Sequence, residues 1–280
     1  MRKIKRRKLL RIYKKILTAI CIIFVCIVAV FPFFWMALIS VKTKIQTYDP
    51  SIWFVKPNFN NYRNIIQVRH VFYYVKNSFI VVSLTTVLSL ALGSMAAYGF
   101  ARFEFKRKEN LAFWILSLRM LPPMATVIPY FVMARITGLL DTHIVLIISY
   151  MLFNIPFTIW MMRGFFEEIP KEIEEAAFVE GCSRLQVFTK ILLPLVSSGF
   201  IATAIFCIIQ SWNEFVFALF LTGVNARTLP TTVTLFLSVT GVVWGEMSAI
   251  GVITALPVMI FAMLVQKYMI RGLTFGAVKQ

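Results

Sequence analysis

Six stretches of this 280-residue chain run for about 20 residues or more with almost no charge, which is the length a helix needs to cross the ~30 Å apolar core of a membrane. Arg119 and Glu214 are the two charged residues inside these stretches. The stretches occupy residues 16–40, 77–101, 110–134, 142–162, 197–220 and 247–266. Because 59% of the residues are hydrophobic and 15% are charged, against about 25% charged in soluble domains, the sequence predicts an all-α polytopic membrane protein with six transmembrane helices.

The net charge of +17 comes mainly from Lys and Arg residues that flank the apolar stretches. Residues 1–15 hold nine of the 29. Twenty Lys and Arg residues would lie on the side of the membrane that contains this segment together with 102–108, 163–190 and 267–280. Eight would lie on the opposite side. Because basic loops stay in the cytoplasm, we expect a multi-pass protein of the cell membrane with both termini cytoplasmic. This distribution indicates membrane orientation and not nucleic-acid binding.

The ends of the apolar stretches divide the chain into segments. The loop that follows the first helix is rich in aromatic and polar residues, so we expect it to form interfacial helices that could meet an extracytoplasmic partner. The expected segments are a basic cytoplasmic N-terminus at 1–15, a first transmembrane helix at 16–40, an external loop at 41–76, a core transmembrane domain at 77–266 with a cytoplasmic loop at 163–194, and a cytoplasmic tail at 267–280.

The longest charged interruption between apolar stretches is the segment 170–194. Pro170 suits the first position of a helix, and the glutamates that follow place negative charge at its positive end. This helix is expected to end near Glu180, because Gly181 can adopt a positive φ. Ser183 and Gln186 have the spacing of a capping box for a second helix. The segment therefore predicts a helix, a tight turn and another helix.

One face of the first of these helices is expected to be exposed. Ile173 and Ala177 share a face at i, i+4 spacing, with Ala176 beside them, and small side chains let another backbone approach closely. Such a surface suits docking into a groove of a partner. The alternative is a helix that lies on lipid headgroups, but its carboxylates would be repelled by anionic lipid.

This segment resembles the EAA loop of ABC importer permeases. The resemblance rests on Glu175-Ala176-Ala177, on Gly181, and on Ile191, Leu193 and Pro194; Glu180 stands where the family often has Asp. It implies the permease fold and a coupling helix that docks on an ATP-hydrolysing subunit. The residues that would carry this coupling are Glu174, Glu175, Ala176, Ala177, Glu180, Gly181 and Pro194.

The motifs that a membrane enzyme or an ATPase would need do not occur in the sequence. There is no H-E-x-x-H or G-x-S-x-G motif, none of the 12 glycines is followed by Lys, and the four cysteines show no metal-site or disulfide spacing. We therefore expect a transport subunit without a metal or cofactor of its own, with ATP bound by a partner subunit.

An ion-coupled secondary carrier is the alternative that the sequence leaves open. Ionisable groups deep in a membrane are costly and usually functional, and Arg119 and Glu214 are such groups. At ~1.5 Å per residue they would lie about 14 Å and about 24 Å from the cytoplasmic side, which disfavours a direct pair. A carrier would not explain the EAA-like loop.

Polar residues in the fourth and fifth apolar stretches are candidates for the solute path. Amides bind hydroxyls as donors and acceptors, and an indole face packs on the C–H face of a sugar. Ordinary hydrogen bonding between helices and an interfacial Trp belt explain the same residues equally well. The candidates are Asn154, Gln210, Ser211, Trp212, Asn213 and Glu214.

Two further stretches look like the carbohydrate branch of these permeases, and in particular the second permease subunit of maltose-type importers. They are Trp212-Asn213-Glu214-Phe215 and the ending Arg271 to Lys279. In that branch the tail reaches the ATPase dimer, which would assign contacts to Gly272, Leu273, Gly276 and Lys279. The resemblance implies import of a sugar, oligosaccharide or polyol. The implied partners are a second homologous permease, two ATP-binding cassette subunits and an extracytoplasmic solute-binding protein.

Overall fold

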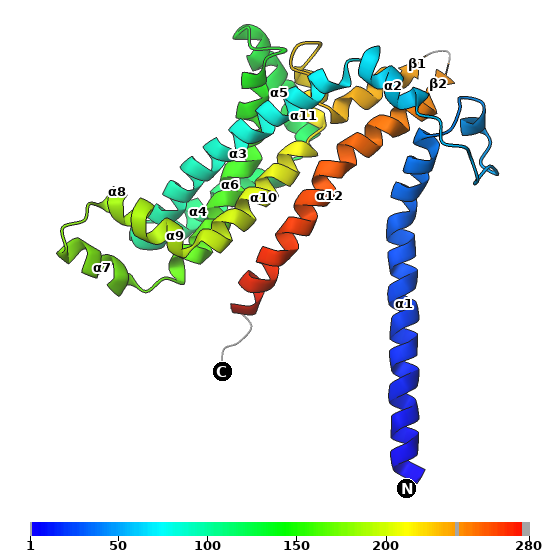
Figure 1. Cartoon of the computed structure of the whole chain (residues 1–280). Helices are drawn as coiled ribbons and strands as arrows, with labels where there is room; N and C mark the ends of the chain where they lie inside the picture. Colours follow the sequence, from blue (N-terminus) through cyan, green and yellow to red (C-terminus); the bar gives the residue numbers. More distant parts are fainter. Residues whose placement is uncertain (1, 239–240, 276–280) are drawn as a thin grey trace. The chain divides into compact units, whose positions relative to one another are not determined.

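A computed structural model describes residues 2–238 and 241–275, in which the regular secondary structure is helical apart from two strands of two residues each (Figure 1). The chain packs into two units. Unit 1 comprises Met1–Arg69 and Phe236–Ile253, and unit 2 comprises His70–Leu235 and Thr254–Gln280. Residues 236–253 group with the N-terminal part of the chain, whereas the sequence analysis assigns them to a core transmembrane domain at 77–266. The predicted domain division stays a prediction.

Unit 1 is built on the long helix α1 (Arg2–Ser40) and includes the start of α12 (Trp244–Phe275). The loop after α1 contains the helices expected there, η1 (Gln46–Tyr48) and α2 (Asn60–Gln67). The α2 side chain Asn61 donates to the carbonyls of Ser40 and Lys42, and Arg69 pairs with Glu246 of α12. The strands β1 (Leu237–Ser238) and β2 (Gly241–Val242) pair antiparallel.

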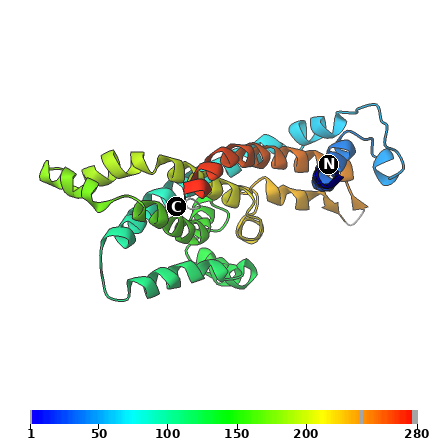
Figure 2. The ribbon, with the colours of Figure 1, turned by 90° about the horizontal axis from the view of Figure 1, so that it is seen from below.

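The centre of unit 2 is a set of three helices, α3 (Val71–Arg102), α6 (His143–Glu167) and α10 (Ser197–Trp212), which pack against one another. Gly93 permits the close approach of α3 and α6, since a Cβ there would lie 2.6 Å from Cβ of Thr158. In the view of Figure 2, the segment that contains α4 (Lys108–Ser117) and α5 (Pro123–Ile136) lies along one side of these helices.

Four helices in the described ranges are long and apolar enough to cross a membrane, or up to six if each of two bent pairs counts as one span. The predicted third span bends by 91° between α4–η2 (η2, Leu118–Met120) and α5. Pro122 and Pro123 explain the bend, because proline removes a helix N–H and disfavours helical geometry in the preceding residue. The second bent pair joins residues 184–195 to α10 at 83°.

The helix ends also differ from the predicted boundaries. α1 continues through the basic segment, α3 begins at Val71 and not at 77, and α12 extends beyond 266. The predicted fifth span stops at Trp212, and a short helix α11 (Val216–Leu221) follows after a break. Hydropathy marks apolar residues and does not by itself locate the residue at which a helix begins or ends.

Candidate functional site

The segment 170–194 folds as a helix, a turn and a second helix, as predicted. α7 (Lys171–Val179) begins one residue later than expected, because Pro170 has an extended ψ of 136° and precedes the helix. Gly181 has φ +85°, and Ser183 forms a capping box with Gln186 at the start of α8 (Arg184–Gln186). These features are confirmed because they depend on local residue chemistry.

The inner face of α7 carries Glu174 and Ala177, the two buried residues of this helix. Ala177 packs in a cluster with Tyr98 and Phe166, so its predicted place on an exposed face is wrong. Glu174 is 4% exposed and pairs with Arg102, while the Tyr98 hydroxyl donates to its other oxygen at 3.1 Å. Glu174 therefore faces its own subunit.

The outer face of α7 presents Ile173, Ala176 and Val179, with Glu175 and Glu180 also exposed. Val179 is 89% exposed and Ile173 is 39% exposed. A narrow apolar stripe between carboxylates therefore lies on the exposed face of α7.

The second half of the segment changes helix type before it reaches α10. A π-helix η3 (Val187–Leu192) follows α8, and Pro194 lies in the short helix α9 (Leu193–Leu195). Val187 and Leu192 are fully buried in the cluster that also holds Ala177. Pro194 thus lies just before the bend into α10, and the π-helix and this bend connect α7 to the centre of unit 2.

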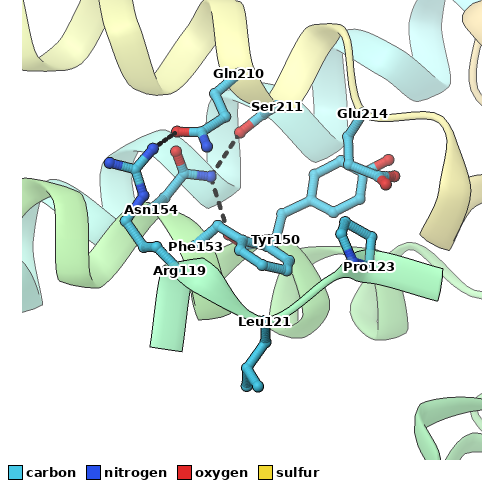
Figure 3. A pocket seen from close by; sticks show the side chains of 9 residues that line it. All are labelled: Arg119, Leu121, Pro123, Tyr150, Phe153, Asn154, Gln210, Ser211 and Glu214. Atoms are coloured by element: carbon cyan, nitrogen blue, oxygen red, sulfur yellow. Dashed lines mark hydrogen bonds between the residues drawn. The ribbon is translucent and has the colours of Figure 1, made fainter. Parts of the chain in front are cut away.

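A cavity of about 210 Å³ lies in unit 2, among α6, α10 and the broken third span (Figure 3). Four of the six residues predicted for a solute path line it: Asn154, Gln210, Ser211 and Glu214. The other lining residues are Arg119, Leu121, Pro123, Tyr150 and Phe153.

Polar side chains that line this cavity form hydrogen bonds with one another. Arg119 donates to Gln210 Oε1 at 3.2 Å and lies over the Phe157 ring, whose centroid is 4.8 Å from its guanidinium carbon. The Asn154 amide nitrogen donates to Ser211 Oγ at 2.9 Å, as Figure 3 shows. Oδ1 of Asn154 is buried without a hydrogen-bond partner among the described residues, which leaves an acceptor for a further donor.

Glu214 caps a helix end at the cavity wall. Its two carboxylate oxygens accept from the backbone N–H groups of Phe217 and Ala218 at 2.9 and 3.2 Å, in the first turn of α11. No ion pair joins it to Arg119 in the part of the chain that the structure describes. Glu214, which the sequence analysis singles out as a charge inside an apolar stretch, thus has a local structural role as the cap of α11.

Trp212 and Asn213 do not line the cavity. The Trp212 indole is buried, donates to the carbonyl of Thr254 at 3.0 Å and meets the Phe79 ring edge-on. Asn213 is exposed and donates to the Ile209 carbonyl. Sequence analysis missed Tyr150, although it lies four residues before Asn154 and therefore on the same helix face.

The tail residues Gly272 and Leu273 lie in α12, of which only the backbone is described at those positions. Gly276 and Lys279 lie outside the described residues.

At the opposite end of unit 2 from α7, one carboxylate organises a loop. Asp141 has φ +58°, and its oxygens accept from the backbone N–H groups of four consecutive residues, 223–226, at 2.8 to 3.1 Å. Burial raises the pKa of Asp141, but the hydrogen bonds from Ala226, Asn225, Gly223 and Val224 together outweigh it and hold the pKa below its ordinary value of 3.8.

Replacing Asp141 by Asn should destabilise the protein by about 1.5–3 kcal/mol at neutral pH, because the bonds to a charged acceptor are lost. A lowered folded-state pKa means that this stabilisation is present above the unfolded value and lost as pH falls through the folded value. Thermal unfolding of both proteins should show a constant gap from about pH 5 to 7 that closes in strong acid. A gap that widened in acid would contradict the assignment.

Comparisons with known proteins identify the family to which this chain belongs. Residues 89–275, more than half of the chain, match the family described as the inner membrane component of binding-protein-dependent transport systems. The chain belongs to this permease family. The permease is 35% identical over 272 residues to the trehalose/maltose transport system permease protein MalG of Thermococcus litoralis, a match that covers 96% of this chain and 98% of that protein. It is 34% identical over 254 residues to the diacetylchitobiose uptake system permease protein DasC of Streptomyces coelicolor, covering 89% and 92%.

Solved structures share the fold of the permease. One chain of a bacterial ABC transporter that imports the acidic polysaccharide alginate matches with a TM-score of 0.77 at 23% identity, covering 92% of this chain and 96% of that one. The predicted all-α importer-permease fold is confirmed.

Proposed function

We propose that this permease forms half of the translocation path of an ATP-driven importer for carbohydrates. Two of its relatives are named for trehalose/maltose and for diacetylchitobiose, which are disaccharide-sized, hydroxyl-rich solutes. In the proposed assembly it pairs with a second, related permease, two ATP-binding cassette subunits and an extracytoplasmic solute-binding protein. Both termini lie in the cytoplasm, and ATP is hydrolysed by the partner subunits and not by this chain.

The proposal of an ATP-driven importer rests on the exposed face of α7. A partner that approached it would meet Ala176, whose small side chain lets a backbone come close, with Ile173 and Val179 as apolar contacts. Glu175 and Glu180 border this stripe and can pair with basic residues of an ATPase subunit. Gly181 and the capping box fix where the helix points, and Pro194 follows just before the bend into α10.

The cavity supplies groups that fit a neutral, hydroxyl-rich solute. Arg119 and Gln210 offer donors, and the rings of Tyr150 and Phe153 provide an apolar wall. We propose that Asn154, Gln210, Ser211 and Glu214 line the path, together with Arg119. Trp212 and Asn213 support the fifth span from outside the cavity.

A Gln210→Leu variant should import solute about tenfold more slowly, because it removes hydrogen-bonding groups from the cavity and leaves Arg119 without its acceptor. The Asn213→Leu variant is the matched control, since this neighbouring amide is exposed and lies away from the cavity. Uptake of labelled trehalose, maltose and diacetylchitobiose by cells that express the whole importer measures the effect. Equal uptake by the two variants would remove the cavity from the path.

The function is tested by reconstituting the complex in liposomes. Binding protein loaded with its sugar should stimulate ATP hydrolysis and drive uptake, and the permease alone should hydrolyse no ATP. An ion-coupled carrier would instead transport solute with only an ion gradient. Uptake by the permease alone under a proton or sodium gradient would contradict the proposal.

A further inference from the structure

Helix α3 differs from the other long helices of this permease. It runs for 32 residues, about 48 Å, without a proline. The other three helices that could cross a membrane unbent carry Pro32, Pro156 or Pro257 in their interiors. Since proline removes a backbone hydrogen bond and is a common cause of kinks, α3 is the helix best suited to move as one rigid body.

One end of α3 holds the coupling helix α7 at two points. Arg102, the last residue of α3, forms an ion pair with Glu174 in the first turn of α7. The same guanidinium donates to the carbonyl of Ile169, just before α7 begins, at 2.9 Å. Tyr98, one turn earlier in α3, donates to the second oxygen of Glu174 at 3.1 Å.

Breaking these contacts would cost a large free energy. The side chains of Arg102 and Glu174 are 7% and 6% exposed, and separating a buried ion pair leaves each charge without a partner in a poorly solvated place. Ala177 of α7 is buried in the same hydrophobic cluster as Tyr98 of α3. A displacement of α7 therefore draws the end of α3 with it.

The other end of α3 holds the 223–229 loop. The Asn77 amide donates to the carbonyls of Asn225 and Arg227 at 2.9 and 3.0 Å. The Ser78 hydroxyl accepts from the N–H of Leu229 at 2.8 Å. Asn77 and Ser78 are 2% and 1% exposed, and Asn77 lies about 38 Å along the helix from Arg102.

We infer that α3 is a rigid link through which displacement of α7 by the ATPase subunits reaches the 223–229 loop, with Arg102 and Asn77 as positioning residues at its two ends. This inference rests on the proposed function, because it requires that ATPase subunits move α7. In the proposed orientation the loop lies on the extracytoplasmic side. Closure of the ATPase subunits on the cytoplasmic side would then displace the 223–229 loop at the surface that a binding protein would meet.

The test is hydrogen–deuterium exchange on the assembled complex, with and without a non-hydrolysable ATP analogue. In the unaltered complex the analogue should change exchange of the 223–226 amides about fivefold or more, the lower end of ordinary allosteric coupling. Arg102→Gln and Asn77→Ala should each abolish this response. Arg102→Lys, which keeps the charge beside Glu174, should retain part of it. Glu168→Gln, at an exposed position outside α7 and its docking face, should retain all of it.

The outcomes separate this inference from the function on which it rests. If ATPase subunits give no protection to the amides of α7 in the unaltered complex, the proposed function fails. If α7 is protected but the 223–226 amides do not respond, or respond equally in Arg102→Gln or Asn77→Ala, the link through α3 is wrong. Asn77→Ala leaves no buried charge, so it tests the link even if Arg102→Gln does not assemble.

Discussion

A Gly181→Val variant should reach the membrane in normal amounts and transport about tenfold less solute than the unaltered permease. Gly181 has φ +85°, which costs a β-branched residue roughly 1–2 kcal/mol or more. A Cβ at this position meets no described atom within 4 Å, so the substitution acts through the backbone and not through a clash. The turn would relax and α7 would point away from its partner.

The control for this experiment is Gly181→Asn, because Asn tolerates positive φ far better than Val. Transport of labelled sugar by the whole importer, normalised to permease in the membrane, measures both variants. Gly181→Asn should keep most of the activity. Equal transport by Gly181→Val and the unaltered permease would show that the turn geometry does not matter for coupling.

A Glu175→Lys variant should bind the ATPase subunits at least about tenfold more weakly. Glu175 is exposed beside the apolar stripe of α7, and reversing a charge at a complementary contact exchanges attraction for repulsion. Co-purification of the ATPase subunits with the permease measures binding. The effect should be smaller at high salt, where exposed charges are screened.

Glu168→Lys is the matched control for this charge reversal. Glu168 is exposed and lies just before Pro170, outside α7 and its docking face. It should leave binding of the ATPase subunits near normal. If both reversals weaken binding equally, the effect comes from net charge, and the specific role of Glu175 is contradicted.

The sequence predicted the parts of the 170–194 segment that short-range chemistry determines. Gly181 could be assigned a positive φ and Ser183 a capping box because each depends on residues at most a few positions away. The rotation of α7 about its axis could not be predicted. A nine-residue helix has too few turns to reveal its buried face, and the residue that decides it, Arg102, lies 72 positions away in the chain.

For the candidate cavity, too, the sequence predicted local features but not how distant segments come together. Hydropathy located the apolar stretches, but it carries no direction, so it missed the 91° bend at Pro122 and the 83° bend before α10. Trp212 was grouped with Gln210 because they are neighbours in sequence. Residues two positions apart point in different directions on a helix, and the structure places Trp212 against Phe79.

The most direct test of the account asks whether the exposed face of α7 lies in the cytoplasm beneath an ATPase subunit. A permease with Val179→Cys as its single cysteine carries the probe at an 89% exposed position, where its thiol can ionise in water. A membrane-impermeant maleimide should label it in inside-out vesicles and not in right-side-out vesicles, and added ATPase subunits should slow the labelling. Labelling from the right-side-out face, or labelling that the ATPase subunits do not slow, would contradict the account.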